Sequence, residues 1–191
     1  FNMPRSLKFI LTSSWILLTR CYDAYCTYQL TPDLSKEKNP LVSVLGMGWT
    51  SLLITLFILS AYAIYAYYIS VFHAEDLLPI EKGYSFSNVI AFSYLGLKEE
   101  WPAVFYKFPR DLNRFNQYMG QVLTKCLVFA GFVSSLMWLF INHTDFYKKI
   151  HSASTIYSLL VMGCFVIIYL WNKQLYEEYK SRDESKLMSE L

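Results

Sequence analysis

Charged side chains are scarce in this 191-residue chain. They make up 17% of it, against about 25% in a typical soluble domain. Hydrophobic residues make up 54%, and the mean hydropathy is +0.27. A lone water-soluble domain and a disordered chain therefore both fit this composition poorly. The formal net charge of +2 is too small and too scattered to indicate a nucleic-acid partner.

Glycine, proline and cysteine are also few. Seven glycines and six prolines exclude low-complexity and collagen-like chains. All four cysteines lie in apolar stretches, where a thiol usually serves as a small hydrophobic side chain: Cys21, Cys26, Cys126 and Cys164. The spacing of the first two fits neither a C-x-x-C redox pair nor a zinc knuckle. We therefore expect no structural disulfide, no metal site and no cofactor.

Four apolar stretches are long enough to cross a membrane, at about residues 7–30, 41–72, 118–141 and 153–171. As one helix, the 32 residues of the second stretch would reach about 48 Å at about 1.5 Å per residue, well beyond a hydrocarbon core of about 30 Å. That helix would have to tilt strongly or project from the bilayer. The predicted fold is therefore all-α, a polytopic membrane helical bundle of four transmembrane helices that forms a single domain over residues 1–191.

Two polar segments complete this organisation. The central segment, residues 73–117, mixes aromatic with charged side chains and is divided by Pro79, Pro102 and Pro109. We expect this amphipathic central loop to form one or two helices that lie on the membrane surface or pack beneath the bundle. The tail, residues 172–191, carries charged residues at helical spacing, so we expect it to continue the fourth helix into water.

The distribution of lysine and arginine supports four spans. With four spans, the N-terminus, the central loop and the tail share one side and hold 11 of these residues, while the opposite side holds 4. Without the first span the two sides hold 7 and 9, which gives no bias to interpret. The positive-inside rule then predicts that both termini lie on the cytoplasmic-equivalent side. The apolar composition, rich in tyrosine and phenylalanine, suits an integral protein of a bacterial inner membrane or an organellar one.

The first span contains an intramembrane polar cluster. Thr19, Asp23 and Thr27 recur at helical spacing on one face, and Arg20 lies one turn from Asp23. Ionisable groups inside a membrane cost several kcal/mol unless they are paired or hydrated. Asp23 could be the titrating group of an ion or proton pathway. The interpretation we favour is an internal Arg20/Asp23 pair that fixes this helix to its neighbours.

The hairpin after the first span carries a second pattern, formed by Glu37, Asn39 and Pro40. Asn39 can cap the second helix, with Pro40 at its first position and Glu37 near the positive end of the helix dipole. This capping role is a sufficient physical explanation of the three residues.

These residues, together with Asp23 and Thr27, also resemble a widespread prokaryotic family of small membrane proteins of unknown function. The first hairpin of that family reads D-x-x-x-T and then E-x-N-P. The resemblance covers about residues 15–65, and the glycine often found in the connecting loop is missing here. It implies that Asp23 and the Glu37 end of the hairpin approach one another, and it implies no activity.

The function that the sequence favours is non-enzymatic. The sequence has no G-x-S-x-G, H-E-x-x-H or phosphate-binding glycine motif. His73, Glu75 and Asp76 form only a weak metal-binding pattern. We expect an accessory or structural subunit of a membrane complex, with lipids and other membrane subunits, or itself, as partners. The alternative is a small oligomeric transporter or channel-like protein with Asp23 on a polar path.

Overall fold

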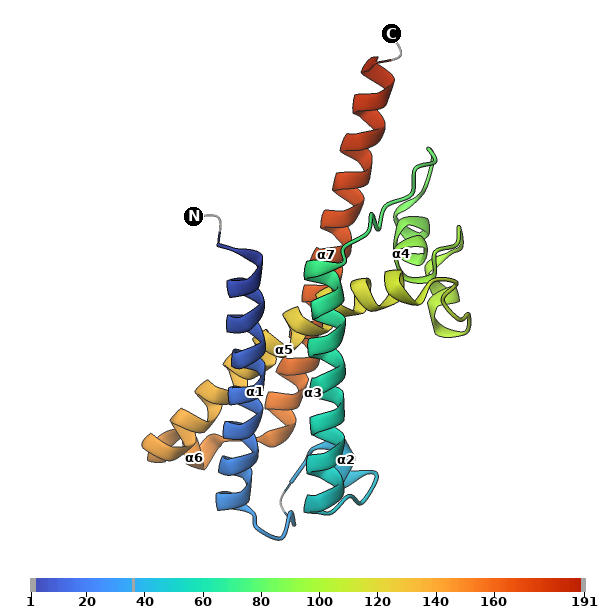
Figure 1. Ribbon diagram of the computed structural model, residues 1–191. Helices are drawn as coiled ribbons and strands as arrows, with labels where there is room; N and C mark the ends of the chain where they lie inside the picture. The colour runs from blue at the N-terminus through green and yellow to red at the C-terminus, as the bar shows by residue number, and fades with distance from the viewer. Residues whose placement is uncertain (1–2, 36, 190–191) are drawn as a thin grey trace. The chain divides into compact units, whose positions relative to one another are not determined.

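The computed structural model describes residues 3–35 and 37–189. Over these residues it consists of helices and connecting loops, with no strand (Figure 1). In chain order the elements are α1 (Arg5–Leu30), α2 (Pro40–Ser43), α3 (Trp49–Phe72), α4 (Phe86–Leu95), the 3-10 helix η1 (Trp101–Phe105), α5 (Leu112–His143), α6 (Asp145–Ile150) and α7 (Ala153–Ser189). The all-α prediction is confirmed.

Among the described residues, three helices are long and apolar enough to cross a membrane: Trp49–Phe72, Leu112–His143 and Ala153–Arg182. They identify the chain as a membrane protein. The helix α1 is not one of the three, because Arg20, Asp23 and several hydroxyl side chains lower its hydropathy. Within α7 the apolar stretch and the polar tail form one unbroken helix as far as Ser189.

The stretch over residues 41–72 does not form the single long helix that the sequence predicts. Asn39 accepts a hydrogen bond from the backbone N–H two residues on, and Pro40 takes the first helical position, but α2 ends after four residues. Gly46 then adopts a left-handed backbone conformation with φ +65°, which redirects the chain. Helix resumes at Trp49, and the 24 residues of α3 span about 36 Å. Asn39 therefore caps a short helix and not a membrane span.

The residues group into two compact units. Unit 1 comprises Phe1–Ile64 and Thr124–Cys164, and unit 2 comprises Tyr65–Leu123 and Phe165–Leu191. The helices α3, α5 and α7 contribute residues to both units.

In unit 1, α1 packs along α5. Three hydrogen bonds join the two helices: Trp15 Nε1 donates to the Val128 carbonyl at 3.3 Å, Arg20 to Ser134 Oγ at 3.2 Å, and Trp138 to Asp23 at 2.7 Å. In addition, Thr19 packs against Gly131, and Cys26 forms a cluster with Trp138 and Ile141. Residue numbers rise together on the two helices, so α1 and α5 run in the same direction where they touch. Gly131 allows their close approach, because a Cβ there would lie 2.5 Å from Thr19 Oγ1.

The side chains of Cys126 on α5 and Cys164 on α7 are neighbours within unit 1. Sequence spacing gave no sign of this pair. We predict that mild oxidation of the full chain with copper phenanthroline joins these two cysteines within one chain, because their side chains are neighbours. Peptide mapping by mass spectrometry measures the product. Cys21 and Cys26 provide the control, since they lie five residues apart on one helix and should stay unpaired.

Unit 2 has its own packed centre around α4. Ser85 and Asn88 form a capping box at its start, and Gly96, with φ +74°, ends it. Four of its residues are buried: Val89, Ala91, Ser93 and Leu95. These residues fix α4 within unit 2.

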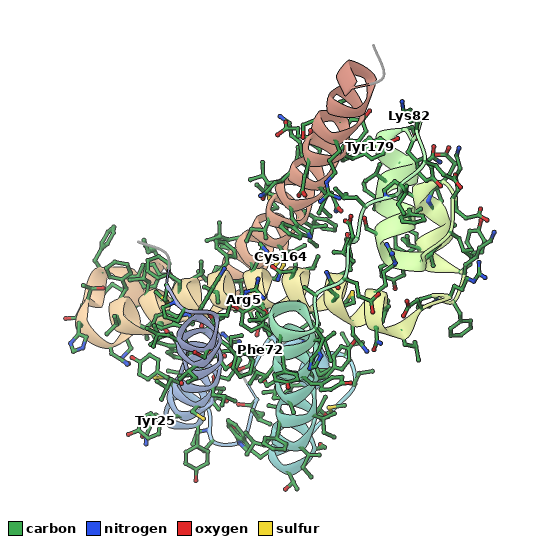
Figure 2. All side chains as sticks on the ribbon, turned by 45° about the horizontal axis from the view of Figure 1, so that its top comes forward. Arg5, Tyr25, Phe72, Lys82, Cys164 and Tyr179 are labelled. Atoms are coloured by element: carbon green, nitrogen blue, oxygen red, sulfur yellow. The ribbon has the colours of Figure 1, made fainter. Side chains whose placement is uncertain are left out.

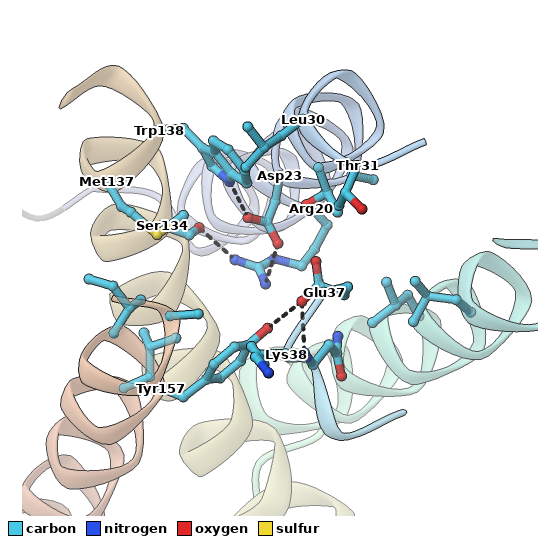
Figure 3. Close-up of a pocket in the computed structure, with 18 of the residues that line it drawn as sticks. Arg20, Asp23, Leu30, Thr31, Glu37, Lys38, Ser134, Met137, Trp138 and Tyr157 are labelled. Atoms are coloured by element: carbon cyan, nitrogen blue, oxygen red, sulfur yellow. Dashed lines mark hydrogen bonds and ion pairs between the residues drawn. The ribbon is translucent and has the colours of Figure 1, made fainter. Parts of the chain in front are cut away.

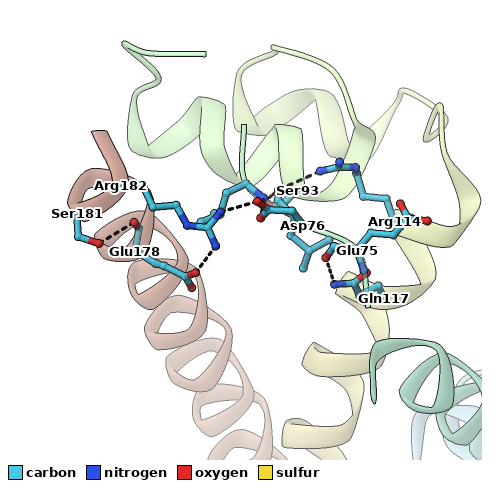
Figure 4. A network of polar contacts seen from close by, with 10 residues as sticks. Glu75, Asp76, Ser93, Arg114, Gln117, Glu178, Ser181 and Arg182 are labelled. Atoms are coloured by element: carbon cyan, nitrogen blue, oxygen red, sulfur yellow. Dashed lines mark hydrogen bonds and ion pairs between the residues drawn. The ribbon is translucent and has the colours of Figure 1, made fainter. Parts of the chain in front are cut away.

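The loop between α3 and α4 is held by three helices of unit 2 (Figure 4). Arg182 of α7 donates to Asp76 and to Glu178, at 2.5 and 2.6 Å. Gln117 of α5 exchanges hydrogen bonds with the backbone of Glu75 at 2.7 and 2.6 Å. The carbonyl of Leu77 accepts from Arg114 of α5 and from Ser93 of α4, at 3.0 and 3.2 Å. These bonds fix the loop to the surrounding helices.

Tyr179 makes a further attachment of α7 to this loop, near Lys82 (Figure 2). Its hydroxyl donates to the carbonyl of Glu81 at 3.0 Å and accepts from the buried amide of Tyr84 at 3.1 Å. We predict that Tyr179→Phe leaves both backbone groups unsatisfied and speeds hydrogen exchange at the Tyr84 amide by about tenfold. Tyr176→Phe is the matched control, because Tyr176 contributes ring contacts that phenylalanine keeps. Equal exchange in both variants would contradict this role.

Candidate functional site

The helix α1 exposes mainly apolar side chains and buries several of its hydroxyl groups. Its exposed side chains are largely apolar, at 43 to 67% exposure: Ile10, Leu11, Leu17, Leu18 and Tyr25. Figure 2 shows Tyr25 pointing away from the ribbon. Ser13, Thr19 and Thr27 are buried instead. A helix exposed to water has the opposite arrangement, with its polar face outward.

A cavity of about 170 Å³ opens beside α1, entirely within unit 1 (Figure 3). Its lining comes from α1, the loop after it, α2's cap, α3, α5 and α7. Four lining side chains carry formal charge: Arg20, Asp23, Glu37 and Lys38. The lining also includes Trp138, Tyr157 and His151, so polar groups enter a cavity whose wall is otherwise largely apolar. We call it the α1 pocket.

Asp23 is fixed in the α1 pocket mainly by a hydrogen bond from Trp138 Nε1, at 2.7 Å. The guanidinium of Arg20 lies farther away, with 3.9 Å between its nearest nitrogen and Asp23 Oδ2. Arg20 also donates to Ser134 Oγ at 3.2 Å. The favoured Arg20/Asp23 pair is therefore present as a loose ion pair, and both of its members are also hydrogen-bonded to α5.

Glu37 reaches the same pocket from the loop. Its Oε1 accepts from the Asn39 amide at 2.7 Å and from the Tyr157 hydroxyl at 3.1 Å. The loop is organised upstream by Asp33, whose carboxylate accepts from the amide and hydroxyl of Ser35. These hydrogen bonds hold the pKa of Asp33 below its usual value. The local turn thus places Glu37 opposite α7.

Two buried nitrogen atoms of pocket residues have no hydrogen-bond partner among the described residues. They are Nε of Arg20 and Nδ1 of His151. Burial also lowers the pKa of His151, which favours its neutral form. A polar cavity of this size has room for several water molecules, which could satisfy both nitrogens. The α1 pocket is thus suited to hold water or a small polar ligand.

The structure brings most of the predicted site residues together. Arg20, Asp23, Thr27, Glu37 and Asn39 all line the α1 pocket. Two others lie elsewhere. The hydroxyl of Thr19 donates to backbone carbonyls of its own helix and packs on Gly131, and Pro40 begins α2 outside the pocket lining. Thr19 therefore serves helix packing.

Among the lining residues that the sequence did not indicate are four with polar groups: Ser134, Trp138, His151 and Tyr157. The bonds from Trp138 to Asp23 and from Tyr157 to Glu37 cross 115 and 120 residues of sequence. No local spacing pattern links residues so far apart.

The described part of the chain contains no group of three or more histidine, cysteine, aspartate or glutamate side chains that could bind a metal ion. Asp76 of the weak histidine and carboxylate pattern pairs with Arg182, while His73 Nε2 lies 3.3 Å from the Tyr68 hydroxyl.

No protein-family model, no curated protein and no solved structure matches the chain.

Proposed function

We propose that α1 is a fourth membrane span and that both termini lie on the cytoplasmic-equivalent side. The support is the run of contacts between α1 and α5, from Trp15 at Val128 to Cys26 at Ile141. Because α5 is apolar enough to span, the part of α1 beside it shares its depth. Arg20 and Asp23 then lie inside the membrane and face the α1 pocket, as ionisable groups at that depth require.

We infer that the chain is a non-catalytic accessory or structural subunit of a membrane complex. The observation that carries this proposal is the surface of α7, whose most apolar window has no buried residue within the chain. Exposed side chains on it recur at spacings of three, four and three residues: Leu159, Met162, Val166 and Tyr169. That spacing forms one seam along a helix, suited to pack on another membrane helix.

Site-specific crosslinking of the full chain tests this subunit role. A benzoylphenylalanine at Met162 should crosslink to another membrane protein, while the same probe at Leu160, which lines the α1 pocket, should crosslink within the chain. Native mass spectrometry in mild detergent should show a stoichiometric complex heavier than the 22.4 kDa chain. A single chain that crosslinks only to lipid at position 162 would contradict the proposal.

A small oligomeric transporter or channel-like protein is the second candidate, and the α1 pocket favours it. A hydratable cavity that contains Asp23, Arg20 and Glu37 supplies part of a polar path. Four helices rarely enclose such a path alone, so this candidate also requires self-association.

Proton flux into liposomes tests this second candidate. The parent protein should conduct, Asp23→Asn should assemble normally but lose flux, and Asp145→Asn, at an exposed position in α6, should keep it. Flux no greater than in protein-free liposomes would reject transport and leave the subunit role.

A further inference from the structure

Four aromatic side chains are exposed at the edge of unit 2, within eight residues of sequence. Trp101 is 51% exposed, Phe105 77%, Tyr106 70% and Phe108 93%. In the same unit, Tyr84 and Tyr118 are almost completely buried, so this exposure does not reflect an open fold. A cluster of large apolar rings at a surface marks a contact with something other than water.

The backbone holds this segment firmly. The Trp101 amide donates to Ser87 Oγ at 2.7 Å, and the Arg110 amide donates to the Leu95 carbonyl at 2.9 Å, so both ends are attached to α4 or its end. Between them Ala103 of η1 is 2% exposed and anchors the segment inward. The aromatic rings are thus presented outward by an ordered scaffold.

The charges around the rings favour an anionic partner. From Trp101 to Arg110 the sequence contains two basic residues and no acidic one. The acidic neighbours are engaged within unit 2: Glu99 pairs with Lys107 at 2.6 Å, Glu100 accepts from Asn88 at 3.1 Å, and Asp111 accepts from the first amides of α5. Arg110 is exposed beside the rings.

Chain connectivity places the segment close to a bilayer. Phe108 lies four residues before α5 begins at Leu112, and α5 is one of the helices able to span a membrane. The apolar part of α5 starts near Tyr118, six residues further on, which is about 9 Å along a helix. The polar layer on each side of the hydrocarbon core is about 5–7 Å thick. A modest tilt of α5 brings the rings into that layer.

We propose that Trp101, Phe105, Tyr106 and Phe108 form an anchor that inserts into the headgroup region of an anionic lipid membrane, the one that α5 enters. Aromatic rings with a polar edge favour this layer, and Arg110 lies beside them as a basic group for lipid phosphates. The anchor fixes the angle at which α5 leaves the bilayer. This inference depends on α5 crossing the membrane and not on α1 doing so.

Spin-label depth measurement on the full chain tests the anchor. Single cysteines at Phe108 and at Ile80, which is 84% exposed in the α3–α4 loop, are compared in a background without the native cysteines. The protein is placed in nanodiscs of equal parts phosphatidylcholine and phosphatidylglycerol. We expect the label at 108 to meet oxygen several-fold more often, relative to a water-soluble nickel chelate, than the label at 80.

Two results would overturn the anchor. A label at 108 as accessible to nickel as the label at 80 would place the rings in water, and one shielded from both quenchers would place a protein over them. Quenching of native tryptophan fluorescence by lipids brominated close to the headgroup gives a second readout. Trp101→Phe should remove part of that quenching, and unchanged quenching would equally overturn the proposal.

Discussion

Replacing Gly120 by alanine is expected to force α3 away from α5 in unit 2 and to destabilise the protein. A Cβ at Gly120 would lie 2.1 Å from the carbonyl oxygen of Ala66, 2.4 Å from its carbonyl carbon and 2.8 Å from the amide nitrogen of Tyr67. All three atoms belong to the backbone of a helix, so no side-chain rotation can relieve the clash. Ala66 and Tyr67 are 0% and 3% exposed, which leaves no free space beside them.

Overpacking of this kind costs about 1–3 kcal/mol, and we expect about 2 kcal/mol or more here because the atoms met are rigid. For a chain of this size that corresponds to a fall in Tm of about 4–8 °C. Thermal unfolding in detergent, followed by tryptophan fluorescence, measures it. Gly48→Ala is the matched control, because a Cβ there meets nothing within 4 Å. Equal Tm values for the two variants would show that α3 and α5 do not approach as described.

Removing one member of the Arg20/Asp23 pair is expected to have the second large effect. In Asp23→Leu, the Arg20 guanidinium keeps Ser134 but loses its counter-ion inside the α1 pocket. In Arg20→Met, Asp23 keeps only the Trp138 hydrogen bond. Breaking a fully buried pair costs about 3–5 kcal/mol, and because these side chains are 22% and 33% exposed we expect about 2–3 kcal/mol for each single variant.

The double variant Arg20→Met/Asp23→Leu should be closer to the parent protein than either single variant. A buried ion pair contributes little net stability relative to apolar side chains of similar size, whereas an unpaired charge is strongly unfavourable. The measurement is a double-mutant cycle, in which the free energy of unfolding in detergent is compared among the parent protein, the two single variants and the double variant. Lys173→Met/Glu177→Leu, at an exposed pair in α7 with 3.7 Å between its charged atoms, should change stability little. Additive losses for Arg20 and Asp23 would mean that the two do not interact.

The class of fold could be predicted from hydropathy, because long apolar stretches in a chain of this composition become helices in a membrane. The prediction of one continuous helix over residues 41–72 was wrong, although the sequence contains a sign of the break. Gly46 and Gly48 lie near its start, and Gly46 takes a left-handed conformation that ends helix there. Apolar character alone did not distinguish a stretch that can cross a membrane from one that is continuously helical.

The α1 pocket could be predicted only from α1 and the loop that follows it. Helical spacing grouped Asp23 and Thr27, and both line the pocket. Thr19 lies on the same face of α1 but packs on Gly131 of α5. Which residues of a polar helix face meet a cavity depends on the neighbouring helix, which spacing within α1 does not reveal. The partners from α5 and α7 could not be found, since Trp138 and Tyr157 lie more than 100 residues away. Similarly, composition could not separate the buried aromatics of unit 2 from the exposed ones of the anchor.

Cysteine labelling in sealed, oriented vesicles tests most directly whether α1 crosses the membrane. Single cysteines replace Met3, Val44 and Ile80, which are 50%, 77% and 84% exposed, in a background without the native cysteines. A membrane-impermeant maleimide should label positions 3 and 80 from one side and position 44 from the other. Labelling of positions 3 and 44 from the same side would contradict the fourth span and the placement of Arg20 and Asp23 within the membrane.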